Sequence, residues 1–318
     1  MKKKIITGIA VIGMIAVSAP LAGCGAQATR QAEPVTKDSL LDKALDTFTK
    51  MESMNADINL NMDLKLGATG FSMEMENKTD MNVEGIKDGD SHITGKLHVV
   101  AMGQEKDVQI ESYTVREGDD TVHYSKTDDG SNKGNWTYFK NPADISGITD
   151  TTGSGNDISE MSISQIADIY SRLKESFSDL NLHSETVSYN NVNCYLMDGT
   201  IKGEKLAQLT DTLGQNQDEA SLQNMKMMDL DTKLYFRSND ETPYAIEIDL
   251  GKAIENIISS QSEQMNGVEV SAEEMKVGII FNSFNTVKEV KVPDSVKSSA
   301  VEGMNSLDVQ SLMGLNGI

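Results

Sequence analysis

Few residues of this 318-residue chain have both the type and the spacing that chemistry requires. Cys194, one of two cysteines, alternates with Val192 and Leu196, which predicts a buried, inert thiol on one face of a strand rather than a nucleophile. The histidines show no HExxH or Cys/His spacing, so we predict no metal site and no cofactor. No catalytic residue emerges, and we expect that the protein is not an enzyme. The four histidines are His92, His98, His123 and His183.

Two acidic loops, residues 127–135 and 150–160, offer oxygen atoms that could bind calcium. Neither has the spacing or the closing glutamate of an EF-hand loop. Aspartate, asparagine and glycine are also the residues that turns use, so turn chemistry explains both loops without a metal. His92 and His98 have the same parity and could share a strand face, which surface histidines explain equally well.

The other cysteine, Cys24, stands in a different setting. Lys2, Lys3 and Lys4 precede an uncharged stretch that runs to Leu21, and small residues follow, which is the order of a secretory signal. A transmembrane helix is the alternative, but the stretch is marginal in length and is followed by a polar segment without flanking cations. We therefore predict a signal peptide over residues 1–23.

The sequence Leu21-Ala22-Gly23-Cys24 resembles the lipobox of bacterial lipoproteins. This resemblance implies that Cys24 receives a diacylglycerol and that the chain is cut just before it. Two acyl chains anchor a protein lastingly, so we expect it on the extracytoplasmic face of a cell membrane. Residues 24–36 are small and polar, which predicts the lipidated N-terminus and a flexible tether.

The acidic composition limits the partners. The chain has 28 basic and 49 acidic residues and a formal net charge of −21, which repels nucleic acid and anionic head groups. We expect the membrane contact to come from the lipid alone, and we attribute the acidity to solubility.

The body of the chain begins with a strongly alternating pattern. Residues 56–66 carry apolar side chains at every second position, which predicts a long strand with one dry and one wet face. The next strand repeats the pattern after a turn at residues 67–70, interrupted by Asn77 and Thr79. We take the dry face as the candidate ligand-binding surface, formed by Ile58, Leu60, Met62, Leu64, Phe71, Met73, Met75 and Met81.

Methionine is frequent in the chain, and its adaptable side chain suits apolar binding surfaces. Simple core filling is the alternative, and base rates favour it. Trp136 is interpreted as a core aromatic at a strand end rather than as a binding platform.

Further strands and helices are expected around this hairpin. The pattern predicts strands over residues 92–102, 106–116, 120–126 and 135–140, and helices over 36–51 and 162–177 that cover the dry face. A second group of strands follows, with a short helix at 203–214 and an apolar-striped segment at 253–265. A last strand over 275–293 is expected to end at Pro293. This order predicts an α+β fold with one large curved antiparallel sheet.

This order resembles the half-barrel of the LolA and LppX type of lipoprotein carriers, and a poorly characterised group of Gram-positive lipoproteins. The resemblance rests on the lipobox, "SLLDKALDTFTKMESMNADINLNMDL", the central helix and "VKEVKVPDSV". It implies a half-barrel domain over residues 37–298, helices packed on its concave face, and a concave apolar surface that binds acyl chains. Residues 299–318 are left as a tail, either disordered or docked on the apolar face.

Two functions remain open. The first is a membrane-anchored lipoprotein that holds a lipid or other hydrophobic molecule in the half-barrel cavity. The alternative is a non-enzymatic adaptor or sensor accessory of the cell envelope that acts through contacts with another envelope protein, which predicts a filled cavity and an exposed apolar patch.

Overall fold

The computed structural model describes part of the chain. The described residues are 34–68, 71–86, 89–101, 103–118, 120–130, 134–142, 177–212, 219–261 and 269–302. The signal peptide, Cys24, the helix predicted over 162–177 apart from Phe177, and the tail beyond residue 302 lie outside them, as does most of the tether. Among the described residues, no helix combines the length and the apolar content needed to cross a bilayer.

The fold is mixed α and β, with a large and mostly antiparallel sheet, and the chain divides into two compact units. The hydrogen-bonded strand order runs from β13 at one end to β7 at the other, so the sheet is not closed. β13 pairs with β6 in parallel, whereas the meander strands pair in antiparallel. The order is β13-β6-β5-β4-β3-β2-β1-β12-β11-β10-β9-β7, with β8 paired to β9.

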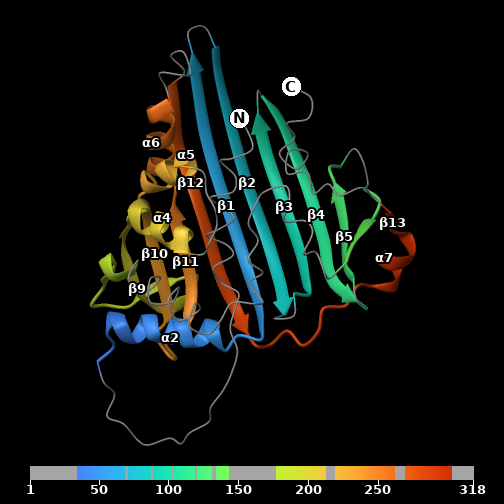
Figure 1. The fold of residues 1–318 in the computed structure, drawn as a ribbon, viewed down its shortest axis with the longest axis horizontal. Coiled ribbons are helices and arrows are strands. Elements are labelled where there is room, and N and C mark those ends of the chain that lie inside the picture. The colour runs from blue at the N-terminus through green and yellow to red at the C-terminus, as the bar shows by residue number, and fades with distance from the viewer. Residues whose placement is uncertain are drawn as a thin grey trace, which may run out of the picture. The chain divides into compact units, whose positions relative to one another are not determined.

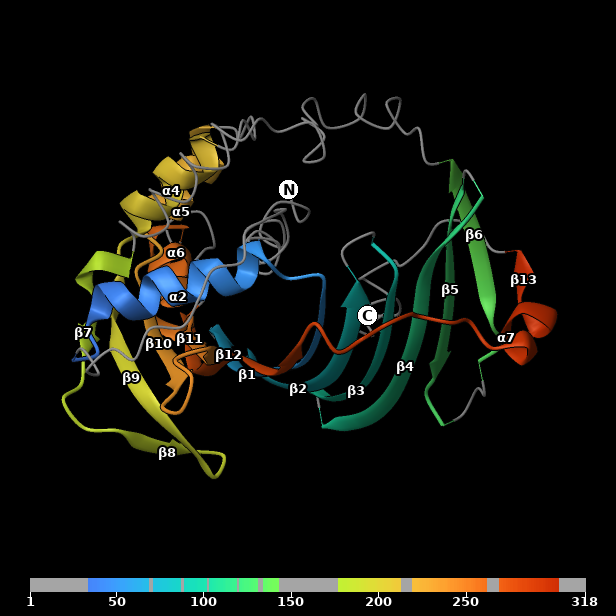
Figure 2. The same cartoon turned by 90° about the horizontal axis from the view of Figure 1, so that it is seen from below.

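One unit, called here the meander unit, contains six consecutive strands joined by short connections (Figure 1). The predicted alternation is confirmed, but the first hairpin is longer than expected, since only residues 69 and 70 separate its two strands. The strands are β1 (Ser53–Ala68), β2 (Phe71–Ile86), β3 (Ser91–Ala101), β4 (Gln104–Glu117), β5 (Asp120–Asp128) and β6 (Thr137–Pro142). Helix α7 (Asp294–Ser299) and β13 (Val301–Glu302) lie beside β6 (Figure 2).

The last long strand, β12 (Glu269–Phe284), corrects the sequence prediction. It begins earlier than residue 275 and ends at Phe284 instead of running to Pro293. Asn285 adopts a left-handed φ of 60°. Its side-chain oxygen accepts a hydrogen bond from the Ser53 backbone N–H, and its own backbone N–H donates to the Ser53 carbonyl. The strand ladder therefore cannot continue past this residue. Pro293 caps α7 instead of ending a strand.

The segment after Asn285 builds a core of its own. Val287, Val290 and Val292 pack with α7 against one side of β4, β5 and β6. Trp136 joins this cluster and its ring centroid lies 5.8 Å from that of Tyr113, so the interpretation as a core aromatic is confirmed. The buried members are Tyr113, Val115, Val122, Tyr124, Val290, Val292 and Val296.

The other unit, the helical unit, combines short helices with strands. Its helices are α2 (Lys37–Thr49), α4 (Gly203–Thr212), α5 (Glu219–Lys226) and α6 (Gly251–Gln261), with a 3-10 turn at Phe177–Asp179. Its strands are β7 (Asn181–Leu182), β8 (Val187–Tyr189), β9 (Val192–Ile201), β10 (Leu230–Arg237) and β11 (Pro243–Asp249), and residues 276–281 of β12 also belong to it. The helix predicted near the N-terminus and the short helix at 203–214 are confirmed, whereas α5 was not expected.

Helix α2 shows how local sequence sets a helix start. The Thr36 hydroxyl accepts a hydrogen bond from the Ser39 backbone, and the Ser39 hydroxyl accepts one from the Thr36 backbone, which forms a capping box. Leu40 is fully buried, and the Phe48 ring meets the Phe281 ring edge-on at 5.4 Å. The helix therefore packs on β11 and β12 of its own unit (Figures 1 and 2).

Candidate functional site

The meander unit has a polar and an apolar side, and its antiparallel register determines which residues share each. We call them the polar face and the apolar face. The polar face carries Asn55, Asp57, Asn59, Asn61, Asp63 and Lys65 of β1, Glu74, Glu76, Lys78, Asp80, Asn82 and Glu84 of β2, His92, Thr94, Lys96 and His98 of β3, and Glu105, Asp107, Gln109 and Glu111 of β4.

Asparagine amides and carboxylates join the central strands of the polar face. The Asn82 amide donates to Asn55 Oδ1 at 3.2 Å and to Asp57 Oδ1 at 2.7 Å. From β12, the Asn282 amide donates to the same two side chains at 2.8 and 2.9 Å. These groups satisfy one another, which indicates a structural role in fixing the strand pairing.

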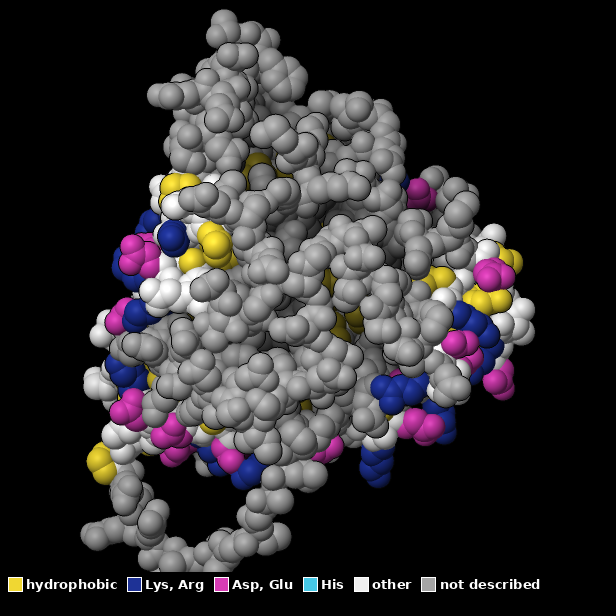
Figure 3. Space-filling model, in the orientation of Figure 1, with side chains coloured by type: hydrophobic (Ala, Val, Ile, Leu, Met, Phe, Trp, Pro, Cys, Tyr) yellow, Lys and Arg dark blue, Asp and Glu magenta, His cyan; other side chains and the backbone are white. Residues whose placement is uncertain are grey.

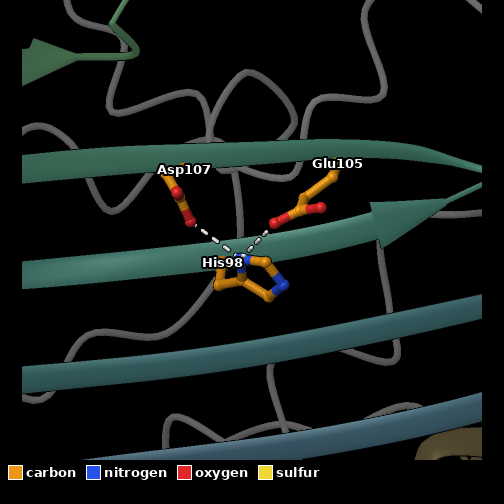
Figure 4. A group of neighbouring side chains, drawn as sticks. All are labelled: His98, Glu105 and Asp107. Atoms are coloured by element: carbon orange, nitrogen blue, oxygen red, sulfur yellow. Dashed lines mark hydrogen bonds and ion pairs between the residues drawn. The ribbon is translucent and has the colours of Figure 1, made fainter.

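Near the turn between β3 and β4, a histidine and two carboxylates of the polar face converge. His98 lies on β3, directly across from Asp107 on β4, and Glu105 lies diagonally across from it (Figure 4). His98 Nδ1 lies 2.7 Å from Asp107 Oδ1 and 3.9 Å from Glu105 Oε1. One potential ligand atom from each of the three residues lies within 4.8 Å of the others.

The local sequence explains this geometry. β3 and β4 form a tight hairpin that pairs Ala101 with Gln104, and Gly103 adopts a left-handed φ of 73° that glycine accommodates without strain. The hydrogen bond to Asp107 raises the pKa of His98, and the charges of Asp107, Glu105 and Glu76 act in the same direction. The site therefore favours a positive charge at the imidazole.

The second histidine of β3 has a different environment. His92 Nε2 lies 3.4 Å from Glu111 Oε1, whereas its Nδ1 lies 3.9 Å from Glu84 Oε2. Each carboxylate therefore lies near a different nitrogen of the ring. Its ring stacks on Tyr113 at a centroid distance of 4.2 Å. The Tyr113 hydroxyl donates to Glu111, and burial raises the pKa of that tyrosine to about 12.

The apolar face contains the ligand-binding surface predicted from the sequence. The register pairs Ile58 with Met81 and Leu64 with Met75, so the two strands present the alternating apolar residues on the same side. Ile58, Leu60, Met62, Leu64, Met75 and Met81 are half-buried. Phe71 and Met73 pair with Ala68 and Leu66, but their side chains lie outside the described part of the structure.

Two details modify this apolar face. The buried Asn77 lies opposite Met62 and accepts a hydrogen bond from Thr79, so a polar pair interrupts the surface as predicted. Met81 lies over Gly95 of the next strand, where a Cβ would come within 2.9 Å of its Cγ. Met81 thus packs across the sheet at a position that requires glycine.

The comparisons with known proteins give a family. The profile of a family of unknown function, DUF6612, matches residues 36–301. The chain belongs to the DUF6612 family. A comparison with curated proteins finds no match. Among solved structures, the crystal structure of a DUF1329 family protein from Desulfovibrio piger ATCC 29098 is similar over 79% of this chain and 94% of that one, with 12% identity and a TM-score of 0.19. A TM-score that low carries no argument about fold or function.

The other residues of this DUF6612 protein that the sequence analysis singled out have structural roles wherever the structure describes them. Cys194 is fully buried among Tyr235, Tyr244 and Ala245, and burial raises its pKa, so the predicted burial of this thiol is confirmed. In the acidic loop at 127–135, the Asp128 carboxylate accepts from the Gly130 backbone at 3.0 Å, which is turn chemistry. The loop at 150–160 lies outside the described residues.

The described residues on the side seen in Figure 3 form no patch of a single charge sign. There, lysine, arginine, aspartate and glutamate side chains lie interspersed among the described residues. Ion pairs on the described surface include Lys65 with Glu273 at 2.6 Å and Lys106 with Asp129 at 3.0 Å. The described surface in this view offers no basic strip for a polyanion.

The convergence of His98 with Glu105 and Asp107 was not predicted. The sequence separates His98 from Asp107 by nine positions, and no metal-binding motif has that form. The available signal was the tight turn at Gly103, because a two-residue loop there places His98 opposite Asp107. Alternation along the strand places His98 on the polar face, and together with that pairing it would have been enough to predict the cluster.

Proposed function

We propose that this DUF6612 protein is a lipid-anchored extracytoplasmic protein that holds a lipid or other hydrophobic molecule against its apolar face. The observation that most supports the proposal is the register of β1 and β2, which gathers the apolar side chains of two long strands on one side. Such a surface binds acyl chains by removing apolar area from water, at about 25 cal/mol per Å².

The half-buried state of these side chains is a second support. Farther along the same apolar face, Leu97 on β3 and Val108 on β4 are only 6% and 7% exposed, as residues of a closed core are. Ile58, Leu60, Met62 and Leu64 keep part of their surface accessible. The methionines add adaptability, because an unbranched thioether can follow the irregular outline of a flexible ligand.

The proposal includes the lipid anchor and draws on the resemblance to the lipoprotein carriers. Cys24 would carry the diacylglycerol, and the half-barrel of LolA and LppX type is the architecture that the sequence resembles. An anchored protein would hold its ligand near the membrane surface rather than carry it across an aqueous space.

Native mass spectrometry with lipid extraction tests the proposal on residues 25–318, purified without harsh detergent. We expect a bound lipid in a stoichiometric amount, and at least tenfold less of it when Met62→Asp and Met75→Asp are combined. The control pair Asn61→Asp and Gln109→Glu adds the same charge on the polar face and should retain the lipid. A milder pair, Met62→Gln and Met75→Gln, serves if the aspartates unfold the unit.

The outcomes separate the candidate functions. Lipid that survives both Met62 and Met75 pairs would exclude the apolar face as its site. A chain that copurifies with no lipid and rejects added phospholipid would contradict the proposal and favour the envelope adaptor, in which the same apolar surface contacts a protein.

A further inference from the structure

We propose that His98, Glu105 and Asp107 form a binding site for a divalent transition-metal ion, with Zn²⁺ as the test ion. The three side chains provide one imidazole nitrogen and two carboxylate oxygens, which are the donor types that Zn²⁺ takes beside thiolate. This inference is independent of the proposed lipid-binding function, because the site lies on the polar face.

The distances permit one ion to contact all three residues. Ligand atoms about 2.1 Å from a tetrahedral ion lie about 3.4 Å from one another. His98 Nδ1 lies 2.7 Å from Asp107 Oδ1 and 3.9 Å from Glu105 Oε1, so one separation must widen and the other narrow by less than about 1 Å. The Glu105 and Asp107 side chains are 69% and 80% exposed, and small rotations of both are unhindered by burial.

The backbone beneath the site is fixed. All three residues lie within the hydrogen-bonded hairpin of β3 and β4, so their Cα positions are set by the ladder (Figure 4). Sites on regular strands hold ligands more precisely than sites on loops. A fourth position remains for water, because the three ligands belong to one surface of the hairpin.

The charge around the site favours a cation. Glu76 on β2 acts on His98 electrostatically and adds to the two carboxylates. Lys78 is paired with His98 across the strands, and its positive charge disfavours a bound cation. However, Lys78 forms its ion pair with Glu76 rather than with the two proposed carboxylate ligands. When Zn²⁺ binds, it replaces the proton between Nδ1 and Asp107, and that proton is released to solvent.

His92 provides a matched comparison on the same strand. It also has two glutamates within 4 Å, but Glu84 is closest to Nδ1 and Glu111 to Nε2. Two carboxylates on opposite sides of an imidazole cannot share one ion with the same nitrogen. The His98 cluster therefore differs from a general excess of surface acid.

Isothermal titration calorimetry with Zn²⁺ tests this site. The full-length chain is purified in detergent with Cys24→Ser, so that the buried Cys194 is the remaining thiol, and is stripped with EDTA. We expect saturable one-to-one binding at pH 7.5, weakened at least tenfold by His98→Ala and by the pair Glu105→Gln and Asp107→Asn. His92→Ala should change the affinity by less than twofold.

A second measurement identifies the coordinating nitrogen. With ¹⁵N-labelled histidine, Zn²⁺ should shift the Nδ1 resonance of His98 and leave those of His92 in place. Absence of saturable binding, equal losses in His98→Ala and His92→Ala, or a shift of His98 Nε2 instead of Nδ1 would each overturn the site. Circular dichroism of each variant separates loss of ligands from loss of folding.

Discussion

His92 and His98 stand on the same face of β3, six positions apart, and each has two carboxylates within 4 Å. Their own exposure is similar, at 25% and 31% of the side chain. The carboxylates differ more, because Glu84 and Glu111 are 42% and 40% exposed, whereas Glu105 and Asp107 are 69% and 80% exposed.

The difference follows from what packs beside each histidine. At the His92 end, the core cluster under Val290 and Val292 includes Tyr113, on which the imidazole stacks. At the His98 end, the hairpin turns at Gly103, and the two carboxylates are close to its tip. The same residue types therefore have a structural role at the His92 end, where a core packs against them, and are accessible for binding at the His98 end, near the tip of the hairpin.

The largest effect that would test this comparison is at Tyr113. Tyr113 is 6% exposed, so Tyr113→Ala removes a buried ring and the stacking partner of His92. We expect a loss of about 3 kcal/mol of unfolding free energy in the meander unit, in line with other buried aromatic truncations. Urea unfolding followed by circular dichroism measures it.

Tyr113→Phe is the control for this prediction. It keeps the ring and removes the hydroxyl that donates to Glu111 at 2.9 Å, which should cost about 1 kcal/mol. If Tyr113→Ala cost less than Tyr113→Phe, the His92 end would not owe its order to the aromatic cluster.

Replacing the two histidines should change the unfolding free energy less than replacing Tyr113 does. His92→Ala loses the stack on Tyr113 and should cost about 1 kcal/mol, because aromatic pairs contribute about 0.5–1.5 kcal/mol beyond area burial. His98→Ala should stay within about 0.5 kcal/mol of the native chain, as surface substitutions do. Thermal unfolding of both variants with EDTA present compares them, and equal losses would remove the structural distinction.

The sequence predicted the strands of this molecule better than the contacts between them. Alternation identified the hairpin at β1 and β2, because burial on one face of a strand leaves a period of two. The end of β12 was missed because it depends on Asn285, whose left-handed backbone is held by hydrogen bonds to Ser53 more than 200 positions away. Such a contact leaves no local pattern.

The candidate sites divide in the same way. The apolar face could be predicted because its members recur at fixed spacing, and the register of β1 and β2 brings them together. The ligand for that face stays a prediction. The His98 cluster combines two strands, and parity alone places His98 on a face without saying what lies across from it.

The smallest effect concerns the charge of His98. Its pKa is raised by the hydrogen bond to Asp107, so its pairing stabilises the fold fully below the ordinary histidine pKa of about 6.5 and is lost as pH rises through the raised value. Asp107→Asn removes the charged partner, and the pKa of His98 should then fall toward its ordinary value. A ¹H–¹⁵N NMR titration with EDTA present measures that pKa directly. An unchanged His98 titration would mean that Asp107 does not hold the imidazole proton, and the distinction between the two ends of β3 would then rest on packing alone.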